Sequence, residues 1–290
     1  MANILILGCG DIGLRCARLL LPAHRVYALA RSETSAQRLR AAGVVPVSGD
    51  LDHAASLARL AGLADWVLYL APPSATGQHD LRMRKLLCAL GKRGILPRRL
   101  VYISTSGVYG DCGGACLDET RTPQPQSERG VRRLDAERQL RLWARRNGIC
   151  APIVRAPGIY AAERLPITRL QQATPVLRAE DDVYTNHIHA DDLARVAIQA
   201  LFLGRAGRVY HACDDSQLMM GDYFDRVAAA LQLPPPPRIS RSEAERSLPA
   251  SRLSFMCESR RMLNMRIKQE LRMRLLYPDI SVGLKTVRPA

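Results

Sequence analysis

Short apolar runs alternate with amphipathic stretches through the first half of this 290-residue chain. The apolar runs predict strands at Ile4–Leu7, Val26–Ala30, Val44–Val47, Trp66–Leu70, Leu100–Ser104 and Cys150–Arg155. The stretches between them predict helices at Ile12–Leu20, Ala36–Ala42, Gln78–Arg93 and Glu128–Asn147. Strands that are apolar at nearly every position are buried on both faces. The alternation therefore predicts a parallel sheet with helices packed on both sides.

The second half of the chain is less regular. Asp191 is a candidate N-cap for a helix that runs to Leu203, because its carboxylate can accept from N–H groups of the first turn. A strand is expected near Arg208–Ala212 and a helix near Met219–Leu233. The run Pro234–Pro237 then predicts a stiff connector.

Together these patterns predict an α/β fold, a Rossmann-type doubly wound parallel sheet with a small C-terminal α/β lobe. Residues 1–155 carry the regular alternation of strands and helices. Residues 156–290 are expected to supply the remaining Rossmann elements, interleaved with the segments of a smaller lobe on the substrate side.

The sequence Gly-Cys-Gly-Asp-Ile-Gly at residues 8–13 follows the first predicted strand and opens the first predicted helix. In that context the presence of a glycine at each of the three positions has a physical explanation. Gly8 allows a tight turn, Gly10 leaves room for a pyrophosphate, and Gly13 lets the helix pack closely against the strand. The motif predicts a site for a nicotinamide dinucleotide.

Two further features of the first half belong to the same predicted site. The backbone N–H groups of Asp11 and Ile12 stand at the start of the helix, where they would face the phosphates. Ala71 and Pro72 follow the fourth strand, at the edge of the sheet where ligands bind. We therefore interpret residues 1–155 as an NAD(P)-binding domain.

The residues after the second and third strands bear on which dinucleotide binds. Arg31 and Ser32 end the second strand, where an arginine accommodates the 2′-phosphate of NADP. Glu33 is the residue that would instead favour NAD, through the ribose 2′-hydroxyl. Asp50 and Leu51 follow the third strand, and the Asp50 carboxylate would accept from the adenine amino group or would cap the next helix. NADP is expected, with NAD as the alternative.

Composition adds a strongly basic balance, with a formal net charge of +15 and nearly all of the positive charge on arginine. The arginines are spread along predicted helices, which favours solvated helix faces over a nucleic-acid surface. Eight cysteines without paired spacing are typical of reduced thiols in the cytoplasm. There is no apolar run of the ~20 residues that a membrane span requires.

At this point the chain resembles the extended short-chain dehydrogenase/reductase family, the NAD(P)-dependent epimerase/dehydratase group. The motifs that carry the resemblance occur in family order and cover most of the chain to about residue 215. They are Gly8–Gly13, Gly49–Leu51, Val101–Gly110, Asp118–Glu119, Arg155–Tyr160 and His187–Ala194. The tail that contains Ser259, Arg260, Arg261 and Asn264 is similar to an atypical bacterial subgroup.

The resemblance implies roles for particular residues. Thr105 matches the catalytic Ser/Thr whose hydroxyl bonds the reacting oxygen, and Ser106 follows it on the substrate side. The segment from Arg155 to Tyr160 would lie by the nicotinamide and the substrate. By resemblance its members divide into cofactor contacts, Pro157 and Ile159, and substrate contacts, Arg155 and Tyr160. The His187–Asp192 segment would border the second lobe, with His187 on the substrate side.

The chain departs from the family at its acid/base pair. Family enzymes carry Tyr-x-x-x-Lys on the helix after the fifth strand, and here those places fall on Arg129 and Arg133. None of the nine tyrosines has a lysine four residues later. Arginine stays protonated, so Arg129 does not replace the tyrosine, although Arg133 can still hold the ribose.

Three interpretations of that departure remain open. Tyr109 or Tyr160 swings in as the acid/base, with Tyr109 the one we assign together with Thr105 and Arg133. Alternatively His187 or His189 serves. In the third interpretation the protein binds the cofactor without redox chemistry. No metal is expected, because the family segment accounts for both histidines.

We therefore expect an NADP-dependent oxidoreductase or epimerase with a non-standard acid/base, acting on a small-molecule substrate. The alternative is a catalytically degenerate NADP-binding regulator or scaffold, and nucleic-acid binding ranks third. The arginine-rich helix Glu128–Asn147 leaves both a monomer and a homodimer open.

Overall fold

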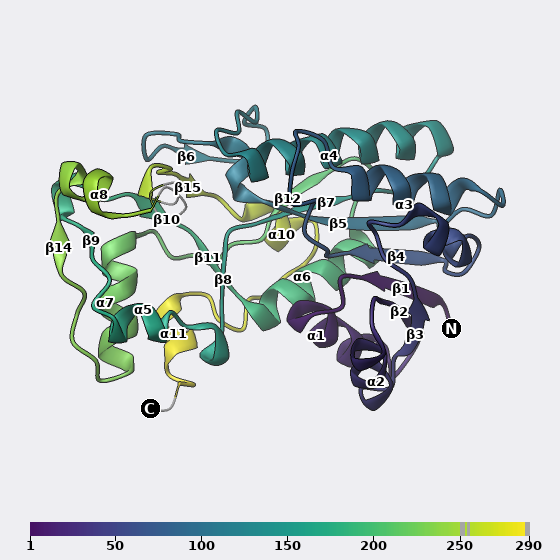
Figure 1. The fold of residues 1–290 in the computed structure, drawn as a ribbon, viewed down its shortest axis with the longest axis horizontal. Coiled ribbons are helices and arrows are strands. Elements are labelled where there is room, and N and C mark those ends of the chain that lie inside the picture. Colours follow the sequence, from purple (N-terminus) through teal and green to yellow (C-terminus); the bar gives the residue numbers. More distant parts are fainter. Residues whose placement is uncertain (250–252, 254–255, 288–290) are drawn as a thin grey trace.

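The computed structural model describes residues 1–249, 253 and 256–287. Its centre is a seven-stranded sheet of order β12-β7-β5-β4-β1-β2-β3, with every neighbouring pair parallel. Figure 1 shows this sheet side-on, with helices above and below it. The strands are β1 (Asn3–Leu7), β2 (Arg25–Ala30), β3 (Val45–Ser48), β4 (Trp66–Tyr69), β5 (Arg99–Thr105), β7 (Ile153–Ala156) and β12 (Val209–His211). The predicted doubly wound sheet is confirmed.

Alternate residues of each strand enter two separate cores. Ile4 and Ile6 of β1 pack with α1 (Asp11–Leu20), α2 (Glu33–Ala41) and α6 (Ala190–Leu203). Leu5 and Leu7 pack on the opposite face with the 3₁₀ helix η1 (Ala54–Leu60), α3 (Leu81–Gly91) and α4 (Glu128–Asn147). Because both faces are covered, the strands are apolar at nearly every position, as the sequence indicated.

Local capping explains where the predicted helix ends shift. Ser32 accepts from the N–H of Ser35, so α2 begins at Glu33, three residues before its predicted start. Asp80 accepts from the N–H groups of Arg82 and Met83, which starts α3 at Leu81. Asn147 ends α4 as predicted, with Gly148 in the left-handed region behind it.

Two elements of the second half differ from their predictions. Asp191 is not the N-cap of α6, which begins at Ala190, because the ring of His189 takes that role by accepting from the Asp191 N–H at 3.2 Å. The Asp191 carboxylate is instead paired with Arg15 of α1. The helix predicted to end at Leu233 is α7 (Met220–Ala230), which stops before Gln232, a residue with φ of +56°.

A smaller lobe lies at the left of Figure 1, beyond the end of the sheet. Its apolar core joins Leu170, Val176, Phe224, Val227 and Ile280. The elements around that core are α5 (Ile167–Gln171), β9 (Val176–Leu177), α7, β14 (Arg238–Ile239), α8 (Arg241–Ser247) and α11 (Ile280–Leu284). Between the first and last of them, α6 and β12 return to the large sheet. Residues 250–252, 254–255 and 288–290 of the predicted second segment lie outside the described part.

Short two-stranded ladders lie outside the large sheet, some within the lobe and some between the lobe and the sheet. β8 (Gly158–Tyr160) pairs with β11 (His187–His189), and β6 (Cys116–Leu117) pairs with β15 (Arg261–Met262). The others join β9 with β14 and β10 (Tyr184–Thr185) with β13 (Leu218–Met219). The β6–β15 ladder brings the C-terminal segment that precedes α10 (Met265–Gln269) beside the loop after β5.

Candidate functional site

The glycine turn between β1 and α1 has the geometry of a phosphate cradle. Gly8 has φ of +84°, and a Cβ there would lie 2.5 Å from the backbone nitrogen of Ala71. A Cβ on Gly10 would meet nothing within 4 Å. A Cβ on Gly13 would lie 3.2 Å from the Gly8 carbonyl oxygen. Gly8 and Gly13 therefore serve close packing, whereas Gly10 keeps an open space at the helix start.

The N-terminus of α1 faces that open space without a side-chain cap. Its first N–H groups, Asp11 and Ile12, thus have no capping side chain to satisfy them. The Asp11 carboxylate is held by Arg15 and Arg164, and although partial burial opposes it, these hydrogen bonds lower the pKa of Asp11. An uncapped helix N-terminus beside a glycine that leaves space fits the pyrophosphate of a dinucleotide.

Two arginines, Arg31 after β2 and Arg38 on α2, are the candidates to contact the adenosine ribose. Arg31 is exposed at the end of β2. Arg38 of α2 folds back and donates to the Cys9 carbonyl oxygen at 3.2 Å, a contact that the sequence did not indicate. Glu33 pairs with Arg40 at 2.7 Å, and both side chains are exposed. Ser32 caps α2.

The remaining predicted cofactor residues line the same edge of the sheet. One carboxylate oxygen of Asp50 accepts from the Asp52 N–H at 2.9 Å, a local turn and not a helix cap. Leu51 is buried. The carbonyl oxygens of Ala71 and Pro72 are both taken, by Arg133 and Arg82 respectively.

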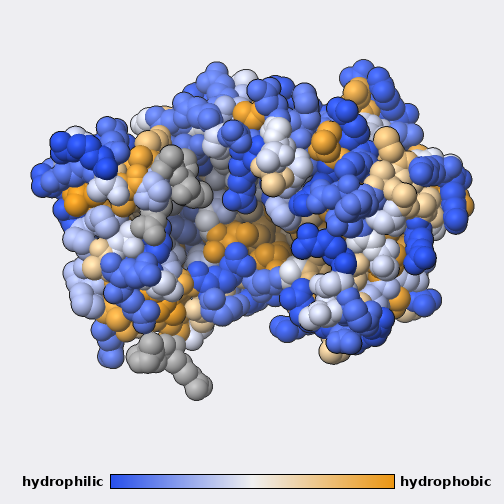
Figure 2. All heavy atoms as spheres, in the orientation of Figure 1, coloured by the Kyte–Doolittle hydropathy of each residue, from blue (hydrophilic) through white to orange (hydrophobic). Residues whose placement is uncertain are grey.

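A cavity of about 530 Å³ opens beyond the ends of β5 and β7. Figure 2 shows the surface hollowed between the small lobe and the sheet, with apolar side chains gathered near β8 and β11. The cavity includes four of the predicted site residues at its sheet end, Thr105, Ser106, Pro157 and Ile159. The other lining residues are Gly107, Ser127, Arg129, Gly130, Gly158, Arg164, Tyr184, Thr185, Asn186, Met220, Glu258 and Arg260.

Thr105 ends β5 and begins the short helix η2 (Ser106–Tyr109). Its hydroxyl oxygen accepts from the Gly107 N–H at 3.2 Å. Because the oxygen is already held as an acceptor, the hydroxyl hydrogen is left for a group in the cavity. This is the arrangement expected of a donor to a substrate oxygen.

The two arginines at the family's Tyr and Lys places behave differently. Arg133 is buried, and its Nη1 donates to the carbonyl oxygens of Ala71 and Ile103 and to the Tyr102 hydroxyl. It therefore ties α4 to the ends of β4 and β5. Arg129 lines the cavity, and among the described residues no acceptor is bonded to it.

Tyr109 and Arg155 lie in a buried cluster and do not line the cavity. Arg155 is 2% exposed and forms a bidentate pair with Glu137 of α4, at 3.0 and 2.7 Å. It also donates to the Tyr109 hydroxyl at 2.7 Å, and that hydroxyl donates to the Nε2 atom of His211. Burial raises the pKa of Tyr109 to about 12, with Arg155 opposing the rise. The anionic partner of Arg155 is thus a residue of this chain.

Tyr160 and His187 both lie in the β8–β11 ladder, where Tyr160 is in register with His189 and His187 with Gly158. The Tyr160 ring is 2% exposed, and burial raises the pKa of its hydroxyl above the ordinary range. His187 stacks on Tyr223 with ring centroids 4.1 Å apart, and burial lowers its pKa to about 3. His187 lines a second cavity on the lobe side, together with Arg169 and Phe224. Burial also lowers the pKa of His189.

The buried His187 ring gives a prediction on pH and stability. Its pKa is lower in the folded protein than in the unfolded chain, so its stabilising contribution is complete above pH 6.5 and is lost as the pH falls toward 3. Replacing the ring by phenylalanine should reduce the slope of unfolding free energy against pH by up to about 1.4 kcal/mol per pH unit. Urea denaturation of His187→Phe between pH 6 and 4.5 measures this effect.

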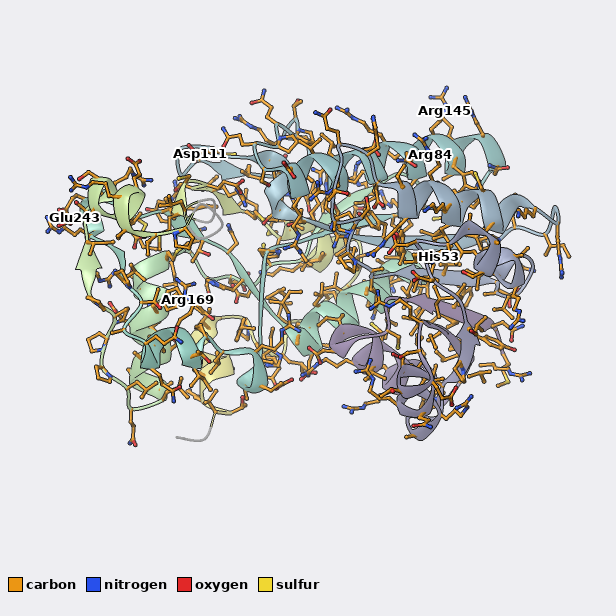
Figure 3. The ribbon with its side chains drawn as sticks, viewed as in Figure 1. His53, Arg84, Asp111, Arg145, Arg169 and Glu243 are labelled. Carbon is orange, nitrogen blue, oxygen red and sulfur yellow. The ribbon has the colours of Figure 1, made fainter. Side chains whose placement is uncertain are left out.

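The matched control for that prediction is His53→Phe. The His53 side chain, labelled in Figure 3, is 76% exposed, so folding moves little of it out of water. Equal acid slopes for wild type and His187→Phe would show that His187 does not stay neutral in the fold.

Two cavity residues come from the C-terminal segment and escaped the sequence-based assignment. Glu258 and Arg260 are paired at 2.7 Å, and Arg260 donates to the Gly110 carbonyl oxygen and to the Ser106 hydroxyl. The sequence marked the Ser259–Arg261 tail as family-like but carried no signal that it returns to the loop after β5. Only the β6–β15 pairing reveals that position.

The described residues hold neither a metal-ligand cluster nor a membrane-spanning helix. In that part of the chain, no cluster of three or more His, Cys, Asp or Glu residues is placed to hold a metal ion. Within the same ranges, there is no helix with the length and apolar character needed to cross a bilayer.

Comparisons with known proteins identify the family and the fold of this chain. A family model described as NAD(P)H-binding matches residues 8–202 of this chain. A functionally unknown conserved protein from Silicibacter pomeroyi is 28% identical, with a TM-score of 0.84 over 99% of this chain and 98% of its own. A curated relative, an uncharacterised protein of Schizosaccharomyces pombe, is 24% identical over 243 residues, 78% of this chain and 79% of the relative.

Enzymes of known activity share the fold at lower identity. UDP-glucose 4-epimerase from Thermotoga maritima, solved with UDP-glucose, is 17% identical, with a TM-score of 0.78 over 98% of this chain and 96% of its own. UDP-glucuronic acid 4-epimerase from Bacillus cereus, solved with NAD, is 19% identical, with a TM-score of 0.77 over 98% and 97%. At these identities the likeness establishes the fold and not the substrate.

Proposed function

Because this chain belongs to the NAD(P)H-binding family, we propose that it is an NADP-dependent oxidoreductase or epimerase of the short-chain dehydrogenase/reductase type. One observation carries the enzymatic part of the proposal. A cavity of about 530 Å³ opens at the Thr105 hydroxyl and at the Pro157–Ile159 segment, where the nicotinamide is expected. A protein that only binds a dinucleotide needs no second cavity beside its reactive end.

The bound cofactor would supply or accept a hydride at a carbonyl carbon, so that carbonyl, NADPH and a proton give alcohol and NADP⁺. Thr105 would donate a hydrogen bond to the carbonyl oxygen and stabilise the charge that develops there. The proton would enter from solvent through the cavity, whose described lining includes the Glu258 carboxylate. Gly10 and the α1 N-terminus would hold the pyrophosphate.

The test is oxidation of NADPH in the presence of a panel of aldehydes, ketones and UDP-sugars. Once a substrate is found, Thr105→Ala should lower kcat by about 100-fold, the cost of one lost oxyanion donor. Thr105→Ser keeps the hydroxyl and should stay within a few-fold of wild type. Thr120→Ala alters an exposed threonine that does not line the cavity and serves as the control. Unchanged kcat in Thr105→Ala would remove Thr105 from the mechanism.

A preference for NADP over NAD is part of the proposal and rests on Arg31 and Arg38. Each would give the 2′-phosphate a charge-assisted hydrogen bond of about 1.5–3 kcal/mol. Arg31→Ala and Arg38→Ala should therefore each weaken NADP⁺ binding by about tenfold or more and leave NAD⁺ binding unchanged. Calorimetric titration with both dinucleotides measures this, with Arg84→Ala on α3 as the exposed control. Equal losses for NAD⁺ and NADP⁺ would contradict a 2′-phosphate site.

A second candidate function is a binding protein that senses NADP without turnover. The observation that favours it is the burial of the candidate acid/base residues. The hydroxyls of Tyr109 and Tyr160 are buried with partners, and burial lowers the pKa of the histidines at positions 187 and 189. Tight NADP⁺ binding with no activity on any member of the panel would favour this function.

A further inference from the structure

Three arginines line the cavity beside Thr105, and they differ in how far their charge is neutralised. Arg164 lies 2.9 Å from an Asp11 carboxylate oxygen. Arg260 lies 2.7 Å from the Glu258 carboxylate. Arg129 has no carboxylate or hydrogen-bond partner in the part of the chain that the structure describes. The cavity lining is therefore cationic, with the surplus charge at Arg129.

Arg129 is an exposed side chain in the cavity wall, so its guanidinium is accessible to a ligand. It lies in the first turn of α4, where the helix dipole disfavours a cation. Arg132 and Arg133 follow on the same helix, and neither is a counter-ion. Arg133, about one turn further along the helix, repels the positive charge of Arg129. An anion in the cavity would relieve both the dipole effect and the repulsion.

Arg260 is a second arginine of the cavity whose hydrogen-bonding capacity is not fully used. Its side chain is 10% exposed, and its Nε atom is buried without a hydrogen-bond partner among the described residues. One Nη atom is occupied by Gly110 and Glu258, and the other reaches the Ser106 hydroxyl only at 3.4 Å. A buried guanidinium that is incompletely bonded costs free energy unless a ligand or water completes it.

The two arginines approach the same short segment from different elements. Arg260 binds around the loop at Ser106 and Gly110. Arg129 precedes Gly130, whose Cβ position lies 2.7 Å from the Gly107 carbonyl oxygen. The start of α4, which carries Arg129, and the Arg260 side chain therefore both border η2, immediately after Thr105. A planar carboxylate or a tetrahedral phosphate is the ligand that guanidinium groups recognise best.

We propose that the cavity binds an anionic group, a carboxylate or a phosphate, between Arg129 and Arg260. This inference deepens the proposed function on which it rests, because it names the substrate class. The substrate is a small carbonyl compound or alcohol whose reacting carbon lies close to a carboxylate or phosphate. In this assignment Arg129 stands where family enzymes carry a proton donor and serves as a binding residue for substrate charge.

The experiment titrates the NADP⁺-saturated protein with sodium oxalate and, separately, with inorganic phosphate in low-salt buffer by calorimetry. Saturation with NADP⁺ removes the phosphate sites of the glycine turn from the measurement. We expect one-site binding that Arg129→Gln weakens by tenfold or more. Arg260→Gln should weaken it as well, and thermal denaturation shows whether that variant is folded. Arg145→Gln is the control, because Arg145 points into solvent at the opposite end of α4 (Figure 3).

The two arms separate the possible sources of the anion. Tighter oxalate binding assigns a carboxylate substrate, and tighter phosphate binding assigns a phosphate ester. The inference is overturned if neither anion binds, or if Arg129→Gln binds them as Arg145→Gln does. NADP⁺ binding without anion binding leaves the proposed function standing. If NADP⁺ itself does not bind, the proposed function fails, and the comparison of Arg129→Gln with Arg145→Gln in the apo protein still tests the anion site.

Discussion

A Gly10→Ala variant should fold like the wild-type protein and lose about 100-fold in NADP⁺ affinity, which corresponds to ~2.7 kcal/mol. The added methyl group meets no protein atom within 4 Å, and the backbone φ of −81° lies outside the left-handed region that favours glycine. It would instead occupy the space that the pyrophosphate needs, and would keep the phosphates away from the N–H groups of α1. Calorimetric titration gives the affinity, and urea denaturation should give a stability within about 1 kcal/mol of wild type.

Gly8→Ala is the matched contrast at the same turn. Its Cβ would lie 2.5 Å from the Ala71 nitrogen, and φ of +84° is strained for alanine. This variant should lose several kcal/mol of stability, on the order of 3–5 kcal/mol, because the close approach of β1 and β4 cannot relax easily. Of these two glycines, which are two residues apart, Gly10 is thus expected to affect NADP⁺ binding and Gly8 to affect stability. Undiminished NADP⁺ affinity in Gly10→Ala would place the dinucleotide elsewhere.

The sequence was sufficient for those parts of the protein that depend on neighbours along the chain. The glycine turn, the strands of the sheet and helix α4 follow from local spacing, and the sheet is confirmed. The strand predicted at Cys150 begins only at Ile153, because Pro152 has no N–H to donate and Cys150 forms an isolated bridge with Arg99. Errors of this kind shift boundaries without changing the architecture.

The cavity residues were beyond such reasoning, because they meet through distant pairings. Glu258 and Arg260 reach the loop after β5 only through the β6–β15 ladder, which joins segments almost 150 residues apart. Nothing in the spacing around Arg38 indicated that its side chain returns to Cys9. The resemblance placed Arg155 near the nicotinamide but carried no information on which carboxylate faces it. A family resemblance gives the approximate position of a residue. The burial and the partners of its side chain determine what the residue does there.

The Arg155–Glu137 pair carries the second large prediction, a loss of about 3–5 kcal/mol of stability when one partner is removed. The side chains are 2% and 0% exposed, so neither charge reaches water. In Glu137→Leu the Arg155 guanidinium stays buried with only the Tyr109 hydroxyl as a partner. In Arg155→Met the Glu137 carboxylate retains Arg141 at 3.3 Å, so this variant should lose less. Urea denaturation at pH 7 measures both.

The double variant Glu137→Leu/Arg155→Met distinguishes pairing from packing. Because it leaves neither charge uncompensated, its loss should be well below the sum of the two single losses, with a coupling of about 2 kcal/mol or more. Arg145→Met, at an exposed position of the same helix, should change stability by no more than about 0.5 kcal/mol. Additive losses would mean that the two side chains act through packing alone.

This pair also bears on the cavity, although neither residue lines it. Glu137 lies on the helix that begins beside Arg129, and Arg155 lies on β7, paired in register with Ser104 next to Thr105. The ion pair therefore fixes the α4 end of the cavity relative to its sheet end. A folded Arg155→Met variant should bind NADP⁺ normally, because the glycine turn is untouched, yet bind oxalate or phosphate more weakly. Such a result would make Arg155 a positioning residue for the anion site.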